Sequence, residues 1–599
     1  NLNLSGVTNM SETFWKCSKI NLNFVKSILS SVSSKLTSSW RMFCSCTNIV
    51  TNDETPLPSN LFSRCTGLTS ISEMFNGCSG IAGGLHADIF KPMTALQNCY
   101  FAFSGTKITG GLNGAALPAT LFSSNKKLTN LERMFNNTLI TIVPPNDLLA
   151  YNTELTTVYG MFSNCPSMIG EIPPTIFRNN SKLTSIGPFF GGCPGITGEI
   201  PRKIFDTNKG KNNSVTNLEG FFSGCNKLTG AIPAYVSDSD KGLFDYSPNL
   251  SWVRSCFSGC SGLTGAIPEN IFKYNNALTR VDYLFNGCSG LGSTPDALAQ
   301  IPPNLLKGKG SITNVAYLFN GCSNIRGSIP DGFLDDNPLI TDISGMFKGC
   351  RELVGQIPVR ESIWVDVPID PTRPELGTVK EEIVSKYGLF DKCAILSTAR
   401  EVFSGCIGLN SFIPETLFIT ATKVTDLSGF FAECYYLQGG VPKDLFKNCN
   451  LLQNTSAMFR NCVSLKEPII DLEDDDNKYA IPKDLFSRNP NISDVSHMFR
   501  MDGSGRPHAP RLIGYVPEDL FKPCGTKLRT IEGLFHACSE ITGTLEGNTF
   551  VNNTELRNCY EAFGETKLTG LGSNLFKTCT KITDMRLTFD SCKSLKGST

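Results

Sequence analysis

Hydrophobic and polar positions along the chain follow one pattern that recurs from end to end. It runs L-T-x-[IV]-x-x-[LM]-F-x-G-C-x-x-L-T-G-x-I-P-x-x-[IL]-F-x-x-[NC] and is nearly complete from Leu250 to Asn275. The first half spaces apolar residues as in Leu278, Val281, Leu284 and Phe285, which can line one face of a short helical, 3₁₀ or irregular segment. The second half, L-T-G-x-I-P, ends at a proline that lacks an N–H. We therefore predict one short parallel strand in the L-T-G-x-I-P half.

The most constant element of the pattern is the anchor Phe-x-x-Cys of its first half, which has fifteen copies at that position, and four further copies keep the Phe but change the last residue. The nineteen anchor phenylalanines are Phe14, Phe43, Phe75, Phe103, Phe135, Phe162, Phe190, Phe222, Phe257, Phe285, Phe319, Phe347, Phe403, Phe431, Phe459, Phe499, Phe535, Phe563 and Phe589. Their commonest separation is 28 residues, within the range of leucine-rich repeats. Because one such coil cannot bury its apolar residues alone, stacking of neighbours is required. We predict an α/β leucine-rich-repeat solenoid of about 19 coils.

The repeats define the domain organisation. Residues 1–358 and 389–599 are predicted to form the two parts of one continuous solenoid. Residues 359–388 interrupt the pattern, and either a projecting lobe or one degenerate coil would account for them. The pattern is cut at both ends, so we expect capping and anchoring segments to lie outside this sequence.

The 24 cysteines follow the repeat as well. Thr replaces Cys at some anchors, and either Cys or Asn occupies the second Phe-x-x position. All three residues are compact and can form a hydrogen bond to a turn from inside the coil. We predict a structural ladder of reduced cysteines, with occasional disulfide bridges as the alternative. The ladder comprises Cys78, Cys165, Cys193, Cys225, Cys260, Cys288, Cys322, Cys350, Cys406, Cys434, Cys462 and Cys538.

Composition excludes several functional classes. Lys and Arg together number 54 and so do Asp and Glu, so no basic field is available to attract nucleic acid. No apolar run is long enough to span a membrane. Only four histidines are present, and the close pairs Cys44/Cys46 and Cys256/Cys260 lack a matching second pair of zinc ligands, so we expect neither an enzyme nor a metal or other cofactor.

The recurring M-F-x-x-C-x-x-L-T motif resembles the BspA-like leucine-rich repeats of bacterial surface proteins, and the resemblance covers nearly the whole chain. It implies a non-catalytic module at the cell surface or outside the cell that binds a protein or glycan on another cell or in the matrix, as an adhesin or capture module. The alternative is a structural or accessory subunit of a larger surface assembly, such as a nutrient-uptake complex, a surface layer or a phage-type attachment apparatus.

Departures from the repeat are the expected place for a ligand site, since the core positions are already used. They include residues 359–388, the acidic stretch between Phe459 and Phe499, and the Gly/Pro/basic loop from Met501 to Arg511. The predicted ligand-binding residues are Trp364, Tyr387, Tyr435, Tyr436, His497, Arg506 and His508.

Overall fold

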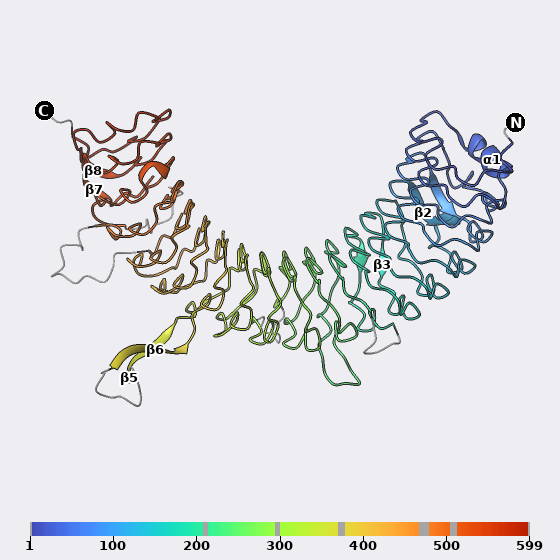
Figure 1. Ribbon diagram of the computed structural model, residues 1–599, viewed down its shortest axis with the longest axis horizontal. Helices are drawn as coiled ribbons and strands as arrows, with labels where there is room; N and C mark the ends of the chain where they lie inside the picture. Colours follow the sequence, from blue (N-terminus) through green and yellow to red (C-terminus); the bar gives the residue numbers. More distant parts are fainter. Residues whose placement is uncertain are drawn as a thin grey trace. The chain divides into compact units, whose positions relative to one another are not determined.

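The computed structural model describes residues 3–207, 214–293, 300–368, 378–465, 479–502 and 512–596. The chain divides into two compact units, Asn1–Ala297 (unit 1) and Leu298–Thr599 (unit 2). Within each unit the backbone winds through successive coils that lie side by side (Figure 1). Each unit is a leucine-rich-repeat solenoid, which confirms the predicted fold class.

Regular secondary structure is sparse in both units. Unit 1 contains α1 (Leu22–Ser31), β1 (Ala82–Leu85), β2 (Lys107–Gly111), the 3₁₀ turn η1 (Leu112–Gly114), β3 (Gly170–Glu171) and β4 (Ile196–Thr197). Unit 2 contains β5 (Glu361–Pro368), β6 (Thr378–Lys386), the 3₁₀ turn η5 (Gly525–Lys527), β7 (Thr542–Leu545) and β8 (Lys567–Leu571). The pairs β1–β2, β3–β4 and β7–β8 are parallel and lie in the L-T-G halves of their coils.

A more continuous ladder lies elsewhere, just before each anchor phenylalanine. One residue of each coil forms a parallel β-bridge with the equivalent residue of the next coil, and we call it the bridge residue. In unit 1 these residues are Asn9, Ser38, Ser70, Asn98, Asn130, Thr157, Ser185, Asn217, Trp252 and Arg280. In unit 2 they are Asn314, Asp342, Thr398, Asp426, Asn454, Asp494, Thr530, Asn558 and Asp584. These two rows match the nineteen predicted anchors, but the main parallel ladder is not in the half of the repeat where we expected it.

The nine residues from each bridge residue to the anchor cysteine position form a turn segment, and the exposed side of successive turn segments is here called the turn face. In the segment Ser70–Cys78, alternate N–H groups donate to the following coil, from Ile71 to Asn98, Glu73 to Tyr100, Phe75 to Ala102 and Gly77 to Ser104. The N–H groups between them close turns within the coil, as from Met74 to the carbonyl of Ile71. Because half of the N–H groups bond to the next coil, the segment cannot continue as a helix, and the short helical option for this half is wrong here.

The anchor phenylalanines form a stack inside each unit. Phe43 lies 5.7 Å from Phe75 between ring centroids, with the ring planes 11° apart. Phe347 stacks in the same way on Phe403, at 5.5 Å and 9°. The coil of Phe403 therefore follows directly on the coil of Phe347, and residues 359–388 insert no anchor between them.

The anchor cysteines lie beside this stack. The thiol of each donates to the carbonyl oxygen of the anchor phenylalanine in the preceding coil, as from Cys78 to Phe43 at 3.0 Å. The same bond is formed by Cys165, Cys193, Cys225, Cys260, Cys288, Cys350, Cys406, Cys434, Cys462 and Cys538. Cys322 is buried at the equivalent position. All 24 cysteines are free thiols. Where Thr replaces Cys, as at Thr106, the hydroxyl donates to the phenylalanine of its own coil instead.

A second polar row follows the second Phe-x-x position. Asn180 is fully buried, and its Nδ2 donates to Leu149 O at 3.1 Å and Asn152 O at 2.9 Å in the preceding coil. Asn125, Asn152, Asn275, Asn337, Asn489 and Asn553 also donate twice. Cysteines at this position form longer hydrogen bonds than asparagine does, and the thiol of Cys393 lies 4.0 Å from its carbonyl acceptor. Asparagine therefore satisfies two buried backbone groups where cysteine can satisfy one.

The strands β5 and β6 pair antiparallel, in contrast to the parallel pairs of the coils. Arg360, at the base of this hairpin, bonds to Glu382 at 2.9 Å and to the buried Asp391 at 3.0 Å. Lys386 adds an ion pair with Asp331 at 3.1 Å. The hairpin is thus tied to the neighbouring coil through charges at its base.

Candidate recognition face

The tryptophans mark the turn face. Trp15, Trp40 and Trp252 lie in turn segments of unit 1 and are 41%, 38% and 44% exposed, whereas the anchor phenylalanines Phe43 and Phe257 of the last two of these coils are fully buried. Burying a tryptophan would remove a large apolar area from water, so its exposure is costly unless a partner covers it. Tryptophan is also enriched among the residues that dominate binding energy at interfaces. The turn face of unit 1 is accordingly the best candidate for a binding surface.

Trp15, Trp40 and Arg41 form a cluster on the first coils. The Arg41 guanidinium lies 4.6 Å from the Trp40 ring centroid and 5.8 Å from that of Trp15. Its Nε donates to Glu73 at 2.8 Å, and this hydrogen bond raises the pKa of Arg41. The Trp40 indole N–H donates to the same carboxylate at 3.3 Å. The cluster therefore presents two fixed aromatic surfaces and a fixed cation, a combination typical of interface anchors.

A groove of about 440 Å³ lies on the turn face of unit 1. Its lining includes Arg133, Tyr159 and Glu219, together with small residues of successive coils such as Gly192 and Gly224. Gly192 and Gly224 have φ values of +76° and +77°, which other residues adopt only with strain. Glycine at these two positions keeps that part of the groove open, whereas Asn164 carries a side chain at the same repeat position.

Unit 2 carries a groove of about 430 Å³ built from the same repeat positions. Its lining includes Tyr317, Arg400, Glu401 and Gly429. The Tyr317 ring lies flat over Gly345 of the next coil, where an added Cβ would come within 2.4 Å of the ring. Lys348 pairs with Glu401 at 2.8 Å. Both grooves therefore offer tyrosine, arginine and glutamate beside small residues.

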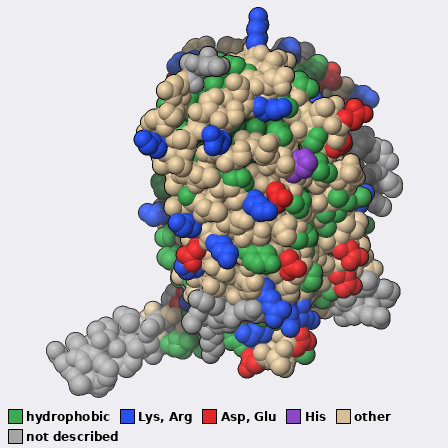
Figure 2. Space-filling view, turned by 90° about the vertical axis from the view of Figure 1, so that its right-hand side faces the viewer, with side chains coloured by type: hydrophobic (Ala, Val, Ile, Leu, Met, Phe, Trp, Pro, Cys, Tyr) green, Lys and Arg blue, Asp and Glu red, His purple; other side chains and the backbone are tan. Residues whose placement is uncertain are grey.

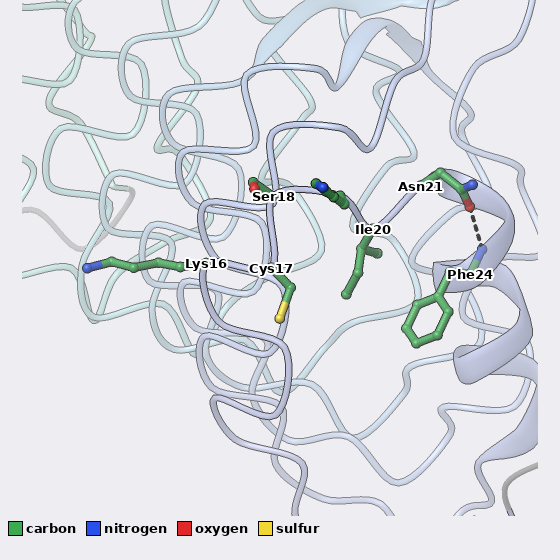
Figure 3. Close-up of a pocket in the computed structure, with 7 residues that line it drawn as sticks. Lys16, Cys17, Ser18, Ile20, Asn21 and Phe24 are labelled. Atoms are coloured by element: carbon green, nitrogen blue, oxygen red, sulfur yellow. Dashed lines mark hydrogen bonds between the residues drawn. The ribbon is translucent and has the colours of Figure 1, made fainter.

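A third hollow, of about 520 Å³, lies between the first turn segment and α1 (Figure 3). Cys17, Ile20 and Phe24 line it, and Lys16 extends away from it. Asn21 caps α1 by accepting a hydrogen bond from the Phe24 N–H at 3.0 Å. Its described lining contains no carboxylate or imidazole that could assist the exposed Cys17 thiol in proton transfer.

Charges of both signs are interspersed over the side of the molecule that Figure 2 displays, without a large field of one sign. In the described ranges no group of three or more His, Cys, Asp and Glu side chains could hold a metal ion. Among the described residues, no helix is both long enough and apolar enough to cross a membrane.

The predicted ligand residues lie in different coils. Trp364 is in β5, with its backbone opposite Glu382 in β6. Tyr387 follows β6, and the Lys392 ammonium lies 3.6 Å from its ring centroid. Tyr435 and Tyr436 follow the anchor Cys434 in sequence, and Tyr436 is 58% exposed. Arg506 and His508, like the predicted acidic stretch around residues 471–476, lie outside the described residues.

His497 alone among these described candidates belongs to a turn segment. Its Nε2 lies 3.4 Å from Glu532, and its ring lies over Gly533 of the next coil. Burial lowers the pKa of His497. The imidazole is therefore neutral over a wider pH range than a free histidine, and its role here is mainly one of packing between coils.

Sequence reasoning missed the turn-face residues Trp40, Arg133, Tyr159 and Tyr317. A signal for them was present, because each occupies one of the two positions located two and three residues before an anchor phenylalanine. Those positions differ between most copies of the repeat, whereas the anchor phenylalanine that follows them is constant.

No family model matches the chain, and no curated protein matches it. Among solved structures, the leucine-rich-repeat ectodomain of the Arabidopsis receptor kinase HAESA, in complex with an extended IDA peptide hormone, aligns at 15% identity over 89% of this chain and 68% of its own, with a TM-score of 0.42. A leucine-rich-repeat protein of Leptospira interrogans aligns at 12% identity over 76% of this chain and 95% of its own, with a TM-score of 0.32. At these TM-scores the likeness carries no argument about function, and the assignment of this chain to the leucine-rich-repeat solenoids rests on its own stacked coils.

Proposed function

We propose that this chain is a non-catalytic recognition module of the BspA-like kind, which acts at the cell surface as an adhesin or capture module. The observation that carries the proposal is the exposure of Trp15, Trp40 and Trp252 together on the turn face. Their partner would be a protein, since exposed aromatic and arginine anchors suit a protein interface. A glycan ligand is the competing outcome of the test.

The proposal also includes the domain organisation, with residues 1–358 and 389–599 as one solenoid that carries the projecting hairpin between them. The interior supports a role without catalysis. Its polar groups, such as the thiol of Cys78 and the amide of Asn180, are engaged by backbone carbonyls and are removed from solvent. An acid–base site would need convergent titratable groups in a pocket.

The hairpin β5–β6 favours a second candidate, an accessory subunit of a surface assembly. Ile363 and Ile383 are directly paired across the two strands and are 60% and 48% exposed. A constitutive interface would cover such a pair and would bury at least about 2,000 Å² in total.

The test measures binding of the purified chain to a panel of matrix and cell-surface proteins and to a glycan array. Trp40→Ser is compared with Tyr151→Ser, which removes an exposed aromatic ring of unit 1 outside the turn segments. A hot-spot tryptophan contributes about 2 kcal/mol or more, so Trp40→Ser is expected to weaken binding of a protein partner about 30-fold while Tyr151→Ser leaves it unchanged. Binding that survives Trp40→Ser and a matching Trp252→Ser, or a partner lost only when the hairpin is deleted, would contradict the assignment to the turn face.

A further inference from the structure

Arg133 differs from the other arginines of the turn segments. Eight arginines lie in these segments, and seven have a carboxylate oxygen within 4.0 Å. The seven are Arg41, Arg254, Arg280, Arg400, Arg460, Arg500 and Arg586. Among the described residues no ion pair is formed by Arg133, although it lines the unit 1 groove. A cation without a carboxylate partner at a groove is a candidate anchor for a ligand anion.

The guanidinium of Arg133 is nevertheless held in place. It lies 5.3 Å from the ring centroid of Phe101 in the preceding coil and 5.3 Å from that of Tyr159 in the following coil. Its stem lies over Gly160, where an added Cβ would come within 3.0 Å of Arg133 Cγ. A guanidinium carries five N–H donors, so contacts with the two rings leave N–H groups of Arg133 able to donate to a ligand. Little conformational entropy would then be lost when an anion binds.

The carboxylates nearest this site do not neutralise it. Glu219 also lines the groove, but it is paired with Arg254 at 3.0 Å. Arg254 in turn pairs with the buried Asp282 at 2.8 Å. Glu132 is half-buried; desolvation raises its pKa and the charge of Arg133 lowers it, but the two side chains form no ion pair within 4.0 Å among the described residues. The described carboxylates near Arg133 therefore form no ion pair with it, and an anionic group of a ligand can supply the opposite charge.

The groove has the size and the lining that an extended segment needs. Its volume of about 440 Å³ falls within the usual range of ligand pockets. Gly192 and Gly224 keep its floor low, and Ser163 and Asn136 add polar groups along its wall. Asn136 already donates to Ser163 Oγ at 2.6 Å, so these wall groups are fixed by one another.

We propose that the unit 1 groove binds an acidic side chain, aspartate or glutamate, of an extended protein segment, with Arg133 as the anion anchor. The inference rests on the proposed function and names the chemistry of the partner. Aspartate and glutamate suit the site because a planar guanidinium bonds a carboxylate through two parallel N–H groups. A sulfated or phosphorylated glycan offers similar oxygens and is the competing source.

The experiment selects peptides from a random library on the intact chain and then measures the affinity of a synthetic consensus peptide. Wild-type protein is expected to select peptides that contain Asp or Glu. The consensus peptide should bind Arg133→Met at least tenfold more weakly, and its Gln variant should lose a similar factor on the wild type. Methionine keeps an unbranched side chain between the two rings, and unchanged circular dichroism and thermal unfolding verify that the variant is folded.

The matched control is Arg586→Met, because Arg586 also stacks on a neighbouring tyrosine but is paired with Asp584 at 2.7 Å. Affinity for this variant should be unchanged. Selected peptides without an acidic preference, or equal affinity for Arg133→Met, would overturn the inference while leaving the proposed function standing. Sulfated oligosaccharides that bind in an Arg133-dependent way, with no acidic peptide selected, would overturn the peptide assignment. A chain that binds no peptide, protein or glycan would overturn both proposals.

Discussion

The asparagine row inside the solenoid gives the sharpest test of what holds the coils together. Asn180 donates to Leu149 O and Asn152 O, and both acceptors belong to the preceding coil. Asn180→Leu keeps a similar volume but removes both donors. The adjacent Asn179 is exposed and donates to Ala150 O at 3.0 Å, so Asn179→Leu is the matched control at the surface.

The magnitude follows from the number of buried groups left without a partner. Each lost hydrogen bond contributes about 1 kcal/mol net, and each buried carbonyl left unsatisfied costs about 1–3 kcal/mol. The Oδ1 atom of Asn180 has no hydrogen-bond partner, so its removal offsets part of the loss. We expect Asn180→Leu to lower stability by about 2–4 kcal/mol. Asn179→Leu should cost less than about 0.5 kcal/mol, since water can satisfy the exposed carbonyl.

The effect should be local, because a coil contacts only its neighbours. Hydrogen exchange followed by mass spectrometry is therefore the appropriate assay, together with guanidinium denaturation. Exchange of amides in the coils on either side of Asn180 should accelerate by about 30- to 700-fold, the factor that corresponds to 2–4 kcal/mol. Equal exchange in Asn180→Leu and Asn179→Leu would refute the idea that buried amide donors stabilise the contact between coils.

Three further perturbations test other parts of the structure. Burial raises the pKa of Cys225 and Cys449 to about 12 from a usual value near 9, so the folded chain keeps protons that the unfolded chain releases. This contribution to stability is complete below pH 9 and is lost as the pH rises from about 9 to 12, and the denaturation midpoint measured against pH should therefore fall in that window. Arg360→Met should free the base of the hairpin and speed exchange in β6 while leaving the coils protected, whereas equal protection would show that the ion pairs do not hold the hairpin. Gly345→Ala should displace the Tyr317 ring and destabilise unit 2 by about 1–3 kcal/mol, because φ is +57° and the added Cβ meets the ring; an unchanged melting temperature would contradict this packing.

Much of the interior was predictable from sequence. Anchor phenylalanines such as Phe257 and cysteines such as Cys260 recur at a fixed period, and stacking requires the same residue type at the same height in each coil. Their burial follows from that requirement alone. The position of the main parallel ladder was not predictable, because the apolar spacing before Phe257 fits both a helix and a series of turns. Hydrogen bonds to the next coil decide between them, and these exist only after stacking.

The sequence by itself determined the period of the coils and the positions of the nineteen anchor phenylalanines. Tertiary structure decided which of the variable turn residues meet. Phe101, Arg133 and Tyr159 lie in three successive coils, and only the register of stacked coils places the cation between the two rings. It likewise decided that Trp40 and Trp252, which occupy variable positions of the repeat, are exposed. The physical reason is that repetition fixes what every coil shares, whereas a binding surface is built from the positions at which neighbouring coils differ.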